Sequence, residues 1–202
     1  NRVYRNGEPY KAFDWELIRK DGTKRYVETS VVLLKDSKDQ PIGFQGIARD
    51  ITKRKRTEQE LADESSFQRV LGEIANEFIN IPPAAIDEGI NRALKTAGQF
   101  SRADRSYVII FDFQAGTIRN THEWCRTGIE PQIDNLQDVP IEIFSWIIDQ
   151  LVNLQIVNIP QVAELPPEAK EAKGEFEAEG IQSMLLVPLL SEAKCFGTVG
   201  FD

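Results

Sequence analysis

The stretch FQGIARDITKRKRTEQEL, residues 44–61, changes from one hydrophobic pattern to another within a few positions. Up to Asp50 it carries the apolar and small residues of a strand, whereas Lys53–Arg56 opens a polar run with helical spacing. Thr52 stands at the change and is the predicted N-cap of the helix. The chain therefore divides here into an N-terminal β region and a helix that leads into the remaining residues.

The N-terminal region contains three strand-like runs, Ala12–Arg19, Tyr26–Leu34 and Ile42–Asp50. Asp21-Gly22 between the first two runs is a strong hairpin signal, so the region is predicted to be an antiparallel meander. A region of about 50 residues is at the lower size limit for an independent core. A three-stranded sheet with one apolar face also needs something packed on that face, so we expect half of a domain here.

A long helix is predicted from Lys53 to Asn80, where Ile81-Pro82-Pro83 must break it. Apolar residues recur in its second half at steps of three and four, at Phe67, Val70, Leu71, Ile74 and Phe78. This stripe predicts a packing surface along one side of the helix.

In the rest of the chain the apolar residues alternate between helical spacing and strand spacing. Its predicted elements are a helix over 84–100, a hairpin of Ser106–Phe113 with Thr117–Cys125, a helix from Pro140 to Leu151, a strand over Gln155–Ile159, a charged helix over Glu168–Glu179 and a hairpin of Ile181–Leu190 with Lys194–Phe201. The predicted fold class is α+β, with helices packed on a mainly antiparallel sheet.

Charge and composition exclude several classes of protein. The net charge is −8 and the pI is near 4.9, which argues against a nucleic-acid partner, because phosphate binding needs clustered cations. No run of about 18 apolar residues is present, and Asn1–Gly7 lacks the layout of a signal peptide, so we expect a cytoplasmic fragment with no membrane segment. Cys125 and Cys195 have neither zinc-site nor disulfide spacing.

Residues 1–52 resemble the C-terminal part of a PAS domain. The motif is Phe44–Thr52, in which the last strand ends in Asp-Ile-Thr and runs into a basic helix start, together with Arg19-Lys20-Asp21-Gly22 in the preceding hairpin. The first half of a PAS domain, which walls the cofactor pocket, is missing from this sequence. No flavin or haem is therefore implied.

Residues from about Phe67 to Asp202 resemble a GAF domain of the kind found in bacterial (cyanobacterial-type) sensor histidine kinases and diguanylate cyclases. The resemblance is carried by Ala103–Val108, His122–Cys125, Gly128–Pro131, Val157–Ile159, Gly180–Ser183, Leu186–Leu189 and Phe196–Phe201. It implies a closing helix after Asp202, which this sequence lacks.

The two resemblances imply three segments: a partial PAS domain over 1–52, a connecting signalling helix over 53–80, and a GAF domain over 81–202 with 67–80 as its first helix. This order implies a sensory and regulatory fragment of a multidomain signal-transduction protein, with a histidine kinase output as the leading expectation. The alternative is the sensor region of a diguanylate cyclase. In either case the fragment is expected not to be an enzyme.

Trp124, Phe144, Trp146 and Cys125 are the candidate ligand-binding residues of the GAF domain, and the alternative for each aromatic residue is ordinary core packing. Some GAF domains hold a bilin through a cysteine beside a histidine on the helical side of the pocket. Here Cys125 and His122 fall on a predicted strand, so a covalent bilin is not expected. The sequence has no phosphate-binding glycine loop that would indicate a cyclic nucleotide, and the cofactor is unknown.

Catalytic motifs of hydrolases, P-loop enzymes, zinc proteases, kinases and cyclases are absent from the sequence. No metal site is predicted, because the only histidine has no companion ligands at suitable spacing. The carboxylates of Glu164–Glu179 are interpreted as a solvated helix face, and Lys53–Arg56 as the polar rim of the connecting helix.

A relay role is predicted for the junction and the stripe, through Asp50, Thr52, Phe67, Leu71, Ile74 and Phe78. In this hypothesis the helix of residues 53–80 pairs in a parallel homodimer, and a stimulus on either domain, such as a small molecule in the GAF domain, shifts the rotation or register of the helix. The alternative is a dimerisation and spacing module that binds no ligand. Polar atoms converging on a pocket would favour the first hypothesis, and a filled apolar core the second.

Overall fold

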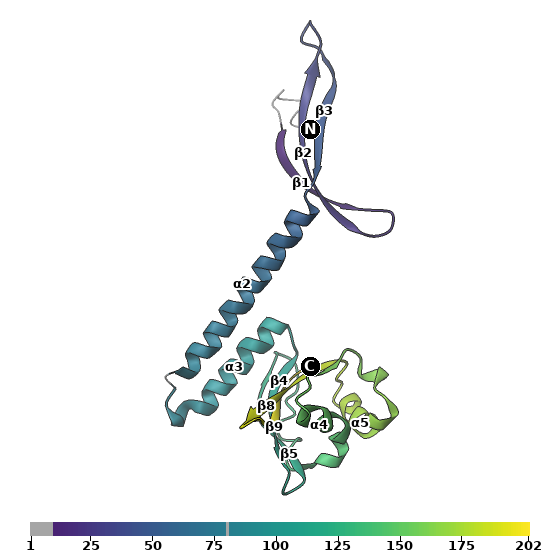
Figure 1. The fold of residues 1–202 in the computed structure, drawn as a ribbon. Helices are drawn as coiled ribbons and strands as arrows, with labels where there is room; N and C mark the ends of the chain where they lie inside the picture. Colours follow the sequence, from purple (N-terminus) through teal and green to yellow (C-terminus); the bar gives the residue numbers. More distant parts are fainter. Residues whose placement is uncertain (1–9, 80) are drawn as a thin grey trace. The chain divides into compact units, whose positions relative to one another are not determined.

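A computed structural model describes residues 10–79 and 81–202, so the predictions for Asn1–Gly7 and Asn80 lie outside the described residues. The chain forms two compact units, Asn1–Gln68 and Arg69–Asp202. The division falls inside one long helix, α2 (Thr52–Ile79), which Figure 1 shows as a continuous element. The first half of this helix belongs to the N-terminal unit and its end to the C-terminal unit.

The N-terminal unit holds a three-stranded antiparallel meander, as the Asp-Gly turn and the three strand-like runs predict. Its strands are β1 (Tyr10–Ile18), β2 (Lys24–Lys35) and β3 (Pro41–Asp50), in that order in the sheet. Trp15 pairs with Val27, and Thr29 pairs with Ala48, which fixes the register across all three strands.

One face of this sheet is apolar. Because directly paired residues share a face, the register places together Phe13, Trp15, Leu17, Val27, Val31, Leu33 and Phe44. Trp15 is 52% exposed and Leu17 49%. No described apolar side chain in β1, β2 or β3 is fully buried, so the described residues do not close a core over this face.

The junction between β3 and α2 differs from the prediction in one respect. Thr52 lies in the first turn of the helix and is not its N-cap, because its hydroxyl accepts a 2.9 Å hydrogen bond from the Tyr26 backbone N–H of β2. Asp50 caps the turn instead, accepting the Thr52 backbone N–H at 2.9 Å, and hydrogen bonding to Thr52, first through its side chain and then through this N–H, lowers the pKa of the Asp50 carboxyl. The Thr52 hydroxyl, which the sequence pattern assigned to the helix N-cap, is therefore bonded to strand β2.

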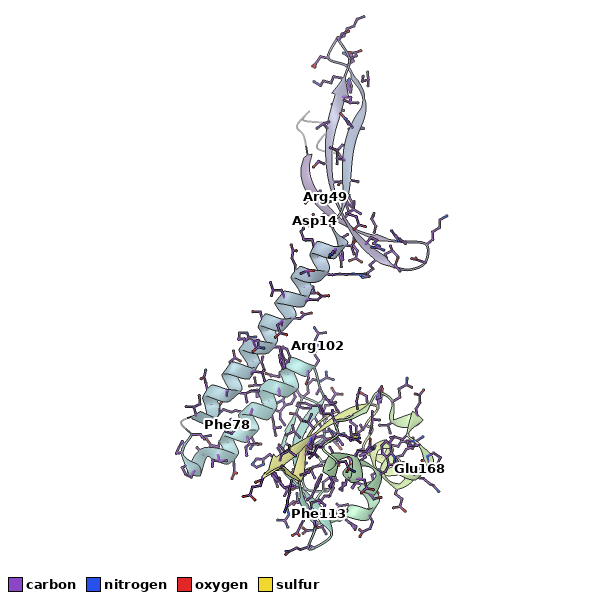
Figure 2. The ribbon with its side chains drawn as sticks, in the orientation of Figure 1. Asp14, Arg49, Phe78, Arg102, Phe113 and Glu168 are labelled. Atoms are coloured by element: carbon purple, nitrogen blue, oxygen red, sulfur yellow. The ribbon has the colours of Figure 1, made fainter. Side chains whose placement is uncertain are left out.

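In the C-terminal unit the end of α2 and helix α3 (Ile86–Ser101) form a helical hairpin, joined through the 3₁₀ turn η1 (Pro83–Ala85). The helices lie side by side in Figure 1, and Arg92 of α3 forms an ion pair with Glu77 of α2. Ile81 packs where Gly89 leaves space on α3, and Phe78 of α2, labelled in Figure 2, lies beside it. Pro82 and Pro83 end the long helix, as predicted.

The sheet of the C-terminal unit has six strands in the order β6-β5-β4-β9-β8-β7, and all of its pairings are antiparallel. The strands are β4 (Arg105–Asp112), β5 (Thr117–Cys125), β6 (Val139–Pro140), β7 (Val157–Ile159), β8 (Met184–Ser191) and β9 (Lys194–Phe201). The central pair is β4 with β9, so residues from the middle and the end of this unit meet.

Helices cover both faces of this sheet. On one face α3 packs closely: the Ser106 hydroxyl donates to the Leu94 carbonyl at 2.8 Å, and Gly98 leaves room for the Trp124 ring. The other face holds the main core beneath α4 and α5. The elements on that side are η2 (Ile141–Phe144), α4 (Ser145–Val152), η3 (Val162–Glu164), η4 (Pro167–Ala169) and α5 (Lys170–Ala178). The predicted α+β class is confirmed.

Candidate functional site

A cavity lies within the C-terminal unit between the sheet and helices α4 and α5. Its volume is about 50 Å³, measured to the centres of water-sized spheres. Most of its wall is apolar, and the apolar residues include Ile109, Phe111, Ile118, Phe144, Ile147, Phe176 and Leu186. The rings of Phe144 and Phe176 stack with their centroids 5.8 Å apart. A mostly apolar recess with a few polar groups is the usual form of a small-molecule site.

The polar groups of the wall gather around Arg105, the first residue of β4. Asp202 directly follows β9, and its backbone exchanges hydrogen bonds with that of Arg105, each 3.2 Å long. The two side chains consequently meet, with 3.0 Å between Arg105 Nε and Asp202 Oδ1. Glu179 caps the C-terminus of α5, and its Oε2 lies 3.8 Å from Arg105 Nη1. Three elements thus bring one cation and two carboxylates together.

These three groups are held away from water. The side chains of Arg105 and Asp202 are each 5% exposed, and that of Glu179 is 15% exposed. Burial raises the pKa of Glu179 to about 7, although the positive charge of Arg105 opposes the shift. Burial also raises the pKa of Asp202 against the same opposition from Arg105. Glu179 can therefore change its charge near neutral pH.

One oxygen of this cluster has no partner within the part of the chain that the structure describes. Asp202 Oδ1 accepts from Arg105, but Asp202 Oδ2 is buried and makes no hydrogen bond to any described residue. A buried carboxylate oxygen without a donor is costly, because the water that it loses on folding is not replaced. Since Asp202 lines the cavity, this oxygen is an acceptor available to an occupant.

Glu123 fixes the loop that forms another part of the wall. Its Oε2 accepts the backbone N–H groups of Gln132 at 2.9 Å and Ile133 at 3.0 Å. Gln132 and Leu136 of the same loop line the cavity. The carboxylate of Glu123 therefore acts as a structural anchor, with one oxygen already satisfied by two donors.

Tyr107 brings a phenol to the cavity. A Cβ atom on Gly200 of β9 would collide with the Tyr107 ring, so glycine is needed for the ring to lie across that strand. Burial raises the pKa of Tyr107 well above its usual value, which keeps the phenol neutral and able to donate or accept a hydrogen bond.

The four candidate binding residues from the sequence do not form one group. Phe144 lines the cavity, whereas Trp146 is a partly buried residue packed against the core. Trp124 packs towards α3, against Gly98. Cys125 is half-buried, and burial raises its pKa to about 11, so it is a neutral thiol at physiological pH. Ligand binding by these residues stays a prediction.

The six predicted relay residues are spread along the helix and its start. Asp50 ends β3, and Thr52, Phe67, Leu71, Ile74 and Phe78 lie in α2. Leu71 is 45% exposed and Ile74 is half-buried. Their relay role stays a prediction.

The sequence reasoning missed the charged residues of the cavity. It interpreted the carboxylates up to Glu179 as a solvated face, and this is wrong for Glu179, because the end of α5 turns that side chain towards Arg105. Arg105 itself gave a usable signal: it is a charged residue at the start of the strand-like run Arg105–Phe111, whose other members except Ser106 are apolar. A buried arginine requires acidic partners.

The described residues were searched for a metal site and for a membrane-spanning helix. Among residues 10–79 and 81–202, no group of three His, Cys, Asp or Glu side chains is arranged to hold a metal ion. Within the same residues, no helix combines the length and the apolar character that crossing a membrane requires.

The chain matches no family model. It is 27% identical over 201 residues to the methanogenesis regulatory histidine kinase FilI of Methanothrix harundinacea, a match that covers 98% of this chain. The chain spans 22% of the length of that relative.

Two solved structures share the fold. The chromophore-binding domain of the Stigmatella aurantiaca bacteriophytochrome superposes with a TM-score of 0.54 at 12% identity, covering 95% of this chain and 64% of that chain. The phycocyanobilin-bound GAF domain of a cyanobacterial phytochrome gives a TM-score of 0.51 at 15% identity, covering 69% of this chain and 78% of that chain. The chain contains a GAF fold, as the sequence resemblance implied.

Proposed function

We propose that this chain is a sensory and relay fragment of a multidomain sensor histidine kinase. In this proposal the GAF-fold unit binds a small molecule in its cavity, and α2 transmits the resulting change. The observation that carries it is the match of 98% of the chain, from sheet through helix to GAF fold, with one part of a regulatory histidine kinase. The fragment itself is regulatory, and the kinase output lies outside this sequence.

We assign the three-stranded unit to the C-terminal part of a PAS domain. Its strand order and the Asp-Ile-Thr junction support this assignment. Two ion pairs connect the helix to the sheet at this junction. Lys55 Nζ of α2 lies 2.7 Å from Asp14 Oδ2 of β1, and Arg54 Nη2 lies 3.2 Å from Glu28 Oε1 of β2. Together with the Thr52 and Asp50 hydrogen bonds, these contacts join the start of the helix to all three strands.

The helix α2 is proposed to pair with a second copy of the chain. Leu61 is 69% exposed and Leu71 is 45% exposed, and their separation of ten residues fits one side of a coiled coil. A helix that exposes leucine at such spacing gains stability when a partner covers it. A parallel homodimer would place the two sensory units in register.

The cavity supports a ligand-sensing role over a purely structural one. A spacing module needs only a filled apolar core, whereas here buried polar groups converge on a hollow. Buried charges that are not needed for packing are costly to keep. Their presence supports recognition of a small molecule, and the structures of related fold give room for one, since the cyanobacterial GAF domain was solved with phycocyanobilin bound.

Native mass spectrometry of the purified chain tests both parts of the proposal. We expect a dimer that carries an extra mass of a small molecule. The substitution Leu71→Glu should yield monomers, because it places a charge in the pairing side of α2, whereas Ala62→Glu on another side of the same helix should leave the dimer intact.

A bare dimer that fails to bind any small molecule would favour the spacing module. A monomer at all concentrations would exclude the relay through a paired helix.

A further inference from the structure

We propose that the cavity of the GAF-fold unit selects a compact apolar molecule with a cationic nitrogen group, such as a protonated alkylamine, which donates an N–H hydrogen bond to Asp202. This inference rests on the proposed ligand-sensing function and names the chemical class of the ligand. It excludes anions as the preferred occupants.

The charges of the wall favour a cation. Arg105 is the only cationic side chain on the wall described by the structure, and Glu123, Glu179 and Asp202 supply carboxylates. Arg105 is already engaged, with Nε on Asp202 and Nη1 near Glu179. An anion would have to displace these carboxylates from Arg105, whereas a cation meets their surplus negative charge.

Hydrogen-bonding capacity points in the same direction. Asp202 Oδ2 is an acceptor without a donor among the described residues, in a side chain that is 5% exposed. Glu123 Oε2 already accepts two backbone N–H groups, and the Thr198 hydroxyl donates to the Val187 carbonyl at 2.9 Å. The wall therefore offers an unfilled acceptor, and a nitrogen donor is the group that fills it.

The remaining wall sets the shape of the ligand. Phe144, Phe176 and Ile147 present carbon atoms to the hollow, which favours an apolar body. The space open to the centres of water-sized spheres is about 50 Å³, which suits a compact occupant of a few heavy atoms.

The proton on Glu179 gives the site a further property. Glu179 faces Arg105 of β4, Asp202 after β9, Glu175 of its own helix and Glu123 of β5, and burial raises its pKa to about 7. A cation stabilises the ionised form of Glu179, so binding should strengthen as pH rises from 6 to 8. An alkylamine stays protonated over this pH range, so the change in binding affinity comes from the protein.

The test uses three probes with the same branched carbon skeleton: isobutylamine, isobutanol and isobutyrate. Each is titrated into the full chain while chemical shifts of backbone amides are followed by NMR. We expect isobutylamine to shift amides of β4, β9 and α5, and to bind at least about tenfold more tightly than the alcohol, because a charge-assisted hydrogen bond is added. Isobutyrate should bind more weakly than both.

The substitution Asp202→Asn should weaken isobutylamine binding by about tenfold or more and leave isobutanol binding little changed. Asp138→Asn is the matched control, because Asp138 pairs with Arg119 at 2.7 Å on the exposed surface of the same unit. It should not alter the binding of any probe. If Asp202→Asn does not fold, Glu179→Gln should remove the pH dependence of amine binding and serves in its place.

The outcomes separate the ligand class from the function. Tighter binding of isobutyrate, or equal binding of all three probes, overturns the cationic class and leaves the sensory proposal standing. Failure of all three probes to bind also overturns it, while a retained small molecule in native mass spectrometry would still support sensing. Failure of the probes together with no retained molecule removes both proposals.

Discussion

The two sheets of this chain are built from similar strands but bury them differently. In the C-terminal unit Ile118 of β5 is 3% exposed and Leu186 of β8 is 5% exposed, because helices cover both faces. In the N-terminal unit Trp15 and Leu17 of β1 are about half exposed. Strand sequence alone therefore makes a sheet, but a hydrophobic core requires a second layer.

The largest contrast should come from making the same leucine-to-alanine substitution in each of the two units. Leu151 is 1% exposed, and Leu151→Ala should lower the free energy of unfolding of the C-terminal unit by about 2–5 kcal/mol. Leu17→Ala in the N-terminal unit should cost under about 1 kcal/mol, because half of the side chain is already in water. Hydrogen exchange of peptides from each unit measures the two effects separately. Equal losses would contradict the contrast in burial.

The buried acid of the C-terminal unit gives the next effect. Because the pKa of Glu179 is raised to about 7 in the fold, the folded state keeps a proton that the unfolded state has lost between pH 4.5 and 7. Stability should therefore be highest below that range and fall as pH rises through 7, by about 3 kcal/mol at most.

Glu179→Gln should flatten this fall in urea unfolding curves recorded from pH 5 to pH 8. Glu175→Gln on the same helix is the control, and we expect it to leave the fall in place. A wild-type protein whose stability rises over this range would exclude the buried proton.

A single methyl group sharpens the comparison between packed and open positions. Gly200→Ala should destabilise the C-terminal unit by about 1–3 kcal/mol, because the new Cβ collides with the buried Tyr107 ring. Gly72→Ala should instead stabilise α2 by about 0.5–1 kcal/mol, since nothing lies near that position in the helix. Thermal unfolding measures the change in stability of each variant, and we expect the two changes to have opposite signs. If Gly200→Ala also stabilised the protein, the Tyr107 ring would be shown to move aside freely.

The smallest effect is expected at the surface of the N-terminal unit. Lys24 lies 2.8 Å from Glu16, but both side chains are largely exposed. Lys24→Ala should leave the hydrogen exchange of β1 and β2 unchanged, because water screens this pair. A measurable loss of protection there would show that the open sheet depends on its ion pairs.

Local patterns were sufficient to predict most elements. The change at residues 44–61 predicted the end of a sheet and the start of α2, and Pro82 and Pro83 predicted where that helix ends. The helix beginning at Pro140 was predicted as one element, whereas the structure starts it with the 3₁₀ turn η2 before α4. The N-cap assignment of Thr52 failed because Tyr26, which is 26 residues away, takes the hydroxyl.

The sequence by itself determined the order of strands and helices and the α+β class, because hydrophobic period and turn residues act over a few positions. Only the tertiary structure decided the candidate site. Arg105 and Asp202 are 97 residues apart, and they meet because β4 pairs with β9. Glu179 has the local pattern of a solvated helix, and its burial depends on where α5 ends above that strand pair. Charge and burial at such a site arise from distant segments, which no local pattern records.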